Sequence, residues 1–243
     1  MADAKGDTDI VQAIGEWDLV VGTVELTKPL LGELRYELHY EPTDLHDRQG
    51  TFKFVLAPDL LGRSPFPHKE EQDGVWDQLR HIEDGYVAEM SFATMTAQKP
   101  EALVALLKKY DVHVVQMPVY AGELKTFKTS AASSGDLTWV PHLSLRPAVF
   151  YEEDRVTSMQ IYMDDEESAK MAASGIIADL EWLQSRKTNP FVREDAPRLD
   201  YLKQNGVKVY GAVVTGPVRE LEKLRNEPLF HDFDLGRIEV WNW

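Results

Sequence analysis

The chain has 243 residues, with 26 basic and 41 acidic side chains and a formal net charge of −15 at pH 7. Hydrophobic residues make up 43% of it, which is enough for a folded core and excludes wholesale disorder. A surface this acidic repels phosphate groups, so we expect no nucleic-acid binding. Cysteine is absent, which excludes disulfides, thiolate metal sites and a cysteine nucleophile.

The first 68 residues have the pattern of a small β-rich region. Residues 1–14 are expected to be a flexible segment, and residues 15–68 to form the β-rich region itself. Three stretches are rich in alternating or β-branched residues, namely 17–26, 34–40 and 51–56. Turn-type residues separate them, which predicts a short antiparallel meander. A proline-rich crossing at 62–67 then marks a boundary, and residues 69–243 are expected to form a second domain.

From residue 85 onward, strand and helix patterns alternate and form two β-α-β units. A proline begins the helix of each unit. Proline is tolerated in the first turn because the N–H that it lacks would have no hydrogen-bond partner within the helix there. A long insertion between the units carries a helix that starts with the acidic run 164–167. We therefore predict an α+β fold with a ferredoxin-like split sheet and a helical insertion. The strand and helix segments of the two units are residues 85–93, 100–110, 112–120, 207–214, 217–224 and 236–241.

The sequence contains none of the common catalytic or nucleotide-binding motifs considered next. The chain has no Gly-x-Ser-x-Gly, no Walker sequence and no dinucleotide-binding glycine pattern. We therefore expect no catalytic residues, no cofactor and no metal site. Two short clusters could ligate a metal, but polar residues in loops are usually just solvated. They are Asp44, His46 and Asp47, and His231, Asp232 and Asp234; the second leaves a metal-assisted hydrolase as a third hypothesis.

Aromatic residues supply the candidate ligand or partner surface. Trp241 and Trp243 alternate in a terminal strand and so face the same way. Together with Tyr120 and Trp139 they could line a groove for a ligand or a partner. The other interpretation is burial against the long helix that carries Trp182, because aromatic side chains dominate core area.

Several of these segments resemble one known family. The stretch Val-Tyr-Gly-Ala-Val-Val-Thr-Gly-Pro at 209–217 and the closing Trp-Asn-Trp at 241–243 are similar to the C-terminal signature of the sigma factor regulator domain. Residues 88–92, 106–110 and 119–123 are similar to the start of the same domain. The resemblance covers roughly residues 80 to 243. That domain is the outer part of membrane-anchored anti-sigma factors in Gram-positive bacteria.

The resemblance implies a non-catalytic regulator that takes part in signal transduction. Such a domain lies on the extracytoplasmic side of the membrane, tethered by a transmembrane helix that this sequence lacks. Sigma factor would be bound only by an upstream cytoplasmic segment, also lacking here. An envelope signal, either a ligand or a protein, would shift a two-state arrangement of this sensor domain. The main alternative is a stand-alone binding module for a small molecule or glycan with a tryptophan-lined groove.

The resemblance also gives structural roles to its motif residues. It implies that Gly211 and Gly216 permit close packing and turning, and that Tyr210 and Trp241 belong to the core.

Overall fold

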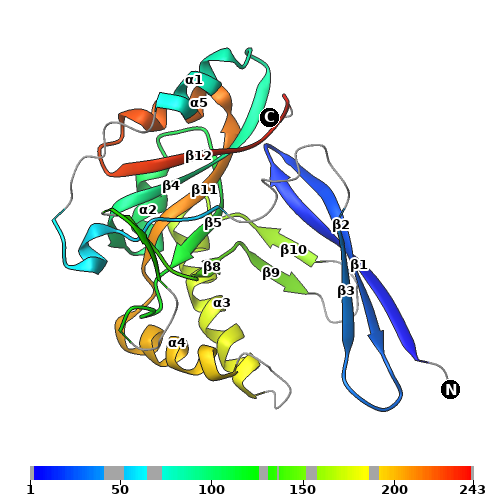
Figure 1. The fold of residues 1–243 in the computed structure, drawn as a ribbon. Helices are drawn as coiled ribbons and strands as arrows, with labels where there is room; N and C mark the ends of the chain where they lie inside the picture. Colours follow the sequence, from blue (N-terminus) through cyan, green and yellow to red (C-terminus); the bar gives the residue numbers. More distant parts are fainter. Residues whose placement is uncertain are drawn as a thin grey trace.

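The structure, a computed structural model, describes residues 3–40, 52–64, 73–125, 131–135, 137–151, 158–185 and 192–241. A three-stranded antiparallel sheet stands at one side of a larger body in which helices pack on a five-stranded sheet (Figure 1). The α+β class predicted from the sequence is confirmed.

The first part is the N-terminal sheet, formed by β1 (Ala4–Ile14), β2 (Trp17–Lys28) and β3 (Arg35–Tyr40) in that order. Residues 4–14, expected to be flexible, form its first strand and pair with β2 along their whole length. The connection between β1 and β2 has two residues, and Gly15 adopts a φ of 60° there. A positive φ at the first turn residue matches the twist of the flanking strands, and glycine adopts it without a steric penalty.

The two faces of the N-terminal sheet differ in chemistry. Val24 pairs with Leu38 and Leu26 with Tyr36, so apolar side chains share one face. Glu25 pairs with Glu37 on the opposite face. Every residue of β3 is exposed, including the apolar ones. The strand predicted over 34–40 is therefore confirmed as β3, but its apolar face is open to solvent.

The body is built around a five-stranded sheet with the order β12-β4-β11-β5-β8, in which all neighbours are antiparallel. The unit β4-α2-β5 leaves a gap that β11 fills, and the unit β11-α5-β12 leaves a gap that β4 fills. The two β-α-β units of the sequence are thus interleaved in one sheet. Its strands are β4 (Tyr86–Gln98), β5 (His113–Val119), β8 (Leu143–Leu145), β11 (Val209–Pro217) and β12 (Phe230–Val240).

Helices cover one face of this sheet and enclose the main core. Side chains that alternate along β4, namely Ala88, Met90 and Phe92, point into this core. Phe92 stacks on Phe230 of the neighbouring strand with ring centroids 4.1 Å apart. The helices are α1 (Asp73–His81), α2 (Pro100–Leu107), α3 (Glu166–Ser185), α4 (Val192–Asn205), α5 (Val218–Lys223) and the short 3₁₀ turn η3 (Leu224–Asn226).

An extended segment covers the other face. We call residues 52–57 the strap; it leads into the 3₁₀ turn η2 (Pro58–Leu61). Phe54 and Leu56 of the strap are buried against Tyr210 and Val213 of β11. A strand was expected over 51–56, but its described part joins no sheet and makes one backbone contact, from Leu56 N to Thr138 O at 2.8 Å. The strap therefore belongs to the body and not to the N-terminal region.

Two short hairpins complete the fold. β6 (Ala132–Ser134) pairs with β7 (Leu137–Trp139), and β9 (Ala148–Tyr151) pairs with β10 (Ser158–Ile161). The expected domain boundary near residue 68 lies outside the described residues.

Candidate functional site

The three predicted surface residues that the structure describes do not form one exposed surface. Tyr120 is only 2% exposed and packs under the strap. Trp139 is half-buried at the end of β7 and lines a cavity. Trp241 is 50% exposed just after β12, and Trp243 lies outside the described residues. Trp182, on the long helix, is also more than half exposed. Burial of Trp241 against that helix is therefore wrong, and so is its assignment to the core.

The cavity beside Trp139 has a volume of about 310 Å³. We call it the Trp139 pocket. It lies on the strap side of the sheet, near the edge formed by β5 and β8. Its walls are residues 52–54 of the strap, residues 139–142, and the single side chains of Gln116, Ser144 and Arg146. Three segments far apart in the sequence thus meet there.

A buried polar cluster lies behind one wall of the pocket. Arg198 of α4 donates from Nη2 to the Pro141 carbonyl at 3.3 Å. Its Nε lies 3.7 Å from Glu123 Oε1. Burial raises the pKa of Glu123, although the nearby Arg198 charge opposes this rise. Burial lowers the pKa of His142, and the Arg198 charge lowers it further. His142 is therefore a neutral ring at pH 7.

A second polar site joins the N-terminal sheet to the body. We call it the junction: residues 12–18 of the β1–β2 hairpin and their partners. Gln12 Nε2 donates to Glu89 Oε2 at 3.0 Å, and Gly15 N donates to Thr215 Oγ1 at 2.8 Å. Tyr162 donates its hydroxyl to Asp18 Oδ1 at 3.1 Å. Ile14 is fully buried at the centre of these contacts.

Glu89 and His113 of the junction have shifted pKa values. Burial raises the pKa of Glu89 to about 7, against the opposing effects of Gln12 and Arg237. His113 on β5 lies 2.6 Å from Asp164 Oδ2 through Nδ1 and 3.5 Å from Glu16 Oε1 through Nε2. The hydrogen bond to Asp164 raises the pKa of His113 despite partial burial. Glu89 therefore changes charge near neutral pH, and His113 keeps its proton to a higher pH than an ordinary histidine, where the hairpin meets the body.

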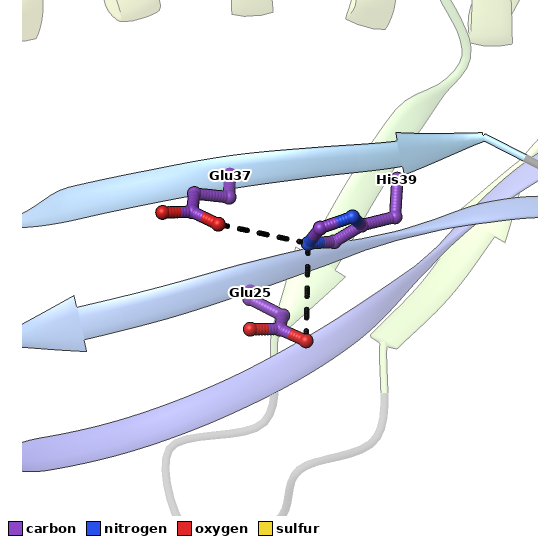
Figure 2. Close-up of side chains that lie close together, drawn as sticks. All are labelled: Glu25, Glu37 and His39. Atoms are coloured by element: carbon purple, nitrogen blue, oxygen red, sulfur yellow. Dashed lines mark ion pairs between the residues drawn. The ribbon is translucent and has the colours of Figure 1, made fainter.

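A cluster of metal-ligand type lies on the face of the N-terminal sheet opposite its apolar face. Figure 2 shows Glu25 and Glu37 beside His39, and their ligand atoms all lie within 4.8 Å of one another. His39 Nε2 is 3.8 Å from Glu25 and 3.9 Å from Glu37. All three side chains are exposed, so water satisfies them, and a protonated His39 pairs with both acids. Among the described residues, His231, Asp232 and Asp234 do not form such a group.

Comparison with known proteins decides the family. The family model described as "Sigma factor regulator C-terminal" matches residues 79–237, which span β4 and most of β12 with the core between them. The chain belongs to the sigma factor regulator family. The resemblance expected over residues 80 to 243 is therefore confirmed for residues 80–237.

One relative is similar over a short stretch. The sigma factor regulator chain is 46% identical over 46 residues to the probable anti-sigma-M factor YhdL of Bacillus subtilis (strain 168). This stretch covers 19% of the chain and only 13% of the relative. No solved structure gives a significant match. Among the described residues, no helix has both the length and the apolar character needed to cross a bilayer.

The motif residues of the family have mostly structural surroundings in this chain. A Cβ on Gly211 would lie 2.4 Å from the Phe92 carbonyl oxygen, and one on Gly216 would lie 2.8 Å from that of Asp111. Both glycines thus permit close backbone approach. Tyr210 is fully buried, as expected.

Proposed function

We propose that the chain is the extracytoplasmic sensor domain of a membrane-anchored anti-sigma factor and that it has no catalytic role. Sigma factor would be bound by a cytoplasmic segment on the other side of a membrane helix, both encoded upstream. The family match over residues 79–237 carries this proposal. The name of the Bacillus relative supports it.

The junction suits a sensor that has two arrangements. The three-stranded N-terminal sheet meets the body through a small set of polar contacts around the buried residues Ala13 and Ile14. A ligand shifts such an equilibrium only if it binds one arrangement more tightly than the other. A change in how residues 12–18 sit on the body would reorient the whole N-terminal sheet.

The surface of the chain also suits a position outside the cell membrane. A net charge of −15 repels most of the domain from anionic lipid headgroups, so contact with lipid is expected only at an exposed apolar segment. The start of β1 pairs with Lys28 and therefore lies beside the 29–34 turn, where Leu30, Leu31 and Leu34 are exposed. Exposed leucines next to the point where the chain enters the sheet suit contact with a lipid surface close to a membrane anchor.

Cysteine labelling tests the location, because the chain has no native cysteine. Lys170→Cys, at an exposed position of α3, is introduced into the complete native gene, and intact cells are treated with a membrane-impermeant maleimide. We expect labelling without lysis. Ala172→Cys, at a buried position of the same helix, should react only after denaturation. Labelling of Lys170→Cys only after lysis would place the domain in the cytoplasm and refute the proposal.

Affinity purification tests the regulatory part. The full-length protein is expected to retain a sigma factor, whereas the 243-residue chain alone is not. A sigma factor bound by the isolated chain would contradict the proposed division of labour.

The alternative function, a stand-alone small-molecule or glycan-binding module, is favoured by the position of Trp139 in a cavity wall. It predicts a native gene that encodes no membrane anchor.

A further inference from the structure

The Trp139 pocket differs in charge from the rest of this acidic chain. The ionised side chains among its described lining residues are Lys53 and Arg146, and no carboxylate is among them. Both cations are exposed at the rim. Within the described part of the chain, neither of them forms an ion pair. The net charge of −15 repels anions from most of the protein surface. The two cations at the rim make the local electrostatic potential favourable for an anion at the pocket.

Strand alternation explains the polar floor of the pocket. On β8, Leu143 and Leu145 point into the helix-side core, so Ser144 between them points toward the strap. Gln116 of β5 reaches the same side and donates from Nε2 to Ser144 Oγ at 2.7 Å. The floor is thus a neutral pair with remaining hydrogen-bonding capacity, since a hydroxyl both donates and accepts.

Aromatic side chains form the walls. Phe52 and Phe54 come from the strap, and Trp139 comes from the end of β7. His142 meets Phe54 edge to face, with ring centroids 5.4 Å apart. Arg198 fixes the adjacent Pro141 carbonyl from behind. The walls are therefore held in place, as binding pockets usually are before the ligand arrives.

We propose that the Trp139 pocket binds a small anionic ligand with a flat apolar body. Lys53 and Arg146 hold the anionic group, the aromatic walls contact the body, and the Gln116–Ser144 pair supplies hydrogen bonds. The volume of about 310 Å³ lies at the small end of the range for ligand pockets, which fits a compact molecule and not a polymer. This ligand class rests on the pocket alone, whereas its action as the envelope signal rests on the function proposed above.

A pair of probes with the same skeleton tests the charge preference. 1-Anilinonaphthalene-8-sulfonate carries a sulfonate, and N-phenyl-1-naphthylamine is the same ring system without it. Fluorescence titration of the 243-residue chain is expected to give saturable binding at one site, tighter for the sulfonate. The variant Lys53→Gln with Arg146→Gln should weaken sulfonate binding about tenfold or more and leave the neutral probe within about twofold.

Two further variants control for charge and for location. Lys99→Gln with Lys170→Gln makes the same change in net charge at exposed positions outside the pocket, and it should leave both affinities unchanged. Ser144→Trp fills the pocket and should abolish binding of both probes. Circular dichroism and the thermal midpoint confirm that each variant is folded.

The outcomes separate this inference from the sensor proposal. Equal affinity for the two probes, or equal losses in the two double variants, would overturn the charge preference. Binding that survives Ser144→Trp would place the probes elsewhere, for example on the apolar face of the N-terminal sheet, and would overturn the site. Neither result affects cysteine labelling in cells, which tests the proposed function by itself.

Discussion

Glu89 gives the sharpest test of the junction. Alternation along β4 sends Met90 into the helix-side core and Glu89 to the opposite side, where Gln12 meets it. A Cβ on Gly236 would lie 2.7 Å from Glu89 Oε2, so the neighbouring strand also closes in on the carboxyl group. Glu89→Gln keeps the size of the side chain and an acceptor for Gln12 but removes the ionisable group.

The size of the expected stability change follows from the shifted pKa of Glu89. Burial raises the pKa of Glu89 from its ordinary value of 4.5 to about 7. The folded state therefore holds a proton that the unfolded state releases between pH 4.5 and 7. The free energy of unfolding of the native chain falls by about 3 kcal/mol as pH rises through this window, then stays level with respect to this group. Glu89→Gln lacks this loss, so we expect it to be more stable than the native chain at pH 8 by up to about 3 kcal/mol.

Urea unfolding at pH 4.5, 6 and 8 measures the effect. The difference between Glu89→Gln and the native chain should be near zero at pH 4.5 and grow with pH. Glu33→Gln removes an exposed carboxylate from the 29–34 turn between β2 and β3 and should show no such growth. An advantage of Glu89→Gln that is the same at pH 4.5 and pH 8 would refute the reasoning.

Three other variants test the junction, the body sheet and, as a control, helix α3. His113 has a raised pKa because of its hydrogen bond to Asp164, so its stabilising effect is complete below its ordinary value of 6.5 and is lost as pH rises through the raised value. His113→Gln should therefore lower the free energy of unfolding by roughly 1 kcal/mol more at pH 5.5 than at pH 9. This difference is small because the side chain is partly exposed. A loss of stability in urea unfolding that does not depend on pH would contradict the assignment. Gly211→Ala should destabilise by about 2–3 kcal/mol or prevent folding, since its Cβ would overlap backbone. Gly175→Ala in α3 meets nothing within 4 Å and should stabilise by about 0.5–1 kcal/mol; thermal midpoints that move in the same direction for both glycines would count against close packing at 211.

The body sheet was readable from the sequence because its central strands are buried on both faces. β11 is buried at every position, and β4 at most of them, so both appear as apolar runs. β12 starts at Phe230, six residues before the strand expected from 236, because polar residues such as Asp232 interrupt its pattern. β1 is mostly exposed, so few apolar residues mark it as a strand.

The packing of the strap and the position of the Trp139 pocket could not be predicted from the sequence. Alternation of Phe52, Phe54 and Leu56 correctly indicated a buried face, yet nothing local shows that this face packs on β11 without joining a sheet. The Trp139 pocket needs three distant segments to converge. Trp139 was among the expected surface residues, but Lys53 and Arg146 were not, because a single cation in a loop has no distinguishing pattern. The two other described candidates, Tyr120 and Trp241, are not among its lining residues.

The N-terminal sheet contacts the body near the hairpin turn at Gly15, so a rotation at this turn would swing the whole sheet. β1 has 11 residues and is paired along its length, so it forms a stiff arm about 36 Å long. A rotation of about 5° at this turn moves the far end of such an arm by about 3 Å, the length of one hydrogen bond. Conversely, a sideways force at the far end of β1 exerts a large torque on the few contacts of residues 12–18, because it acts over the whole length of the strand. Any force applied near the 29–34 turn is thereby concentrated on Glu89, Thr215 and His113.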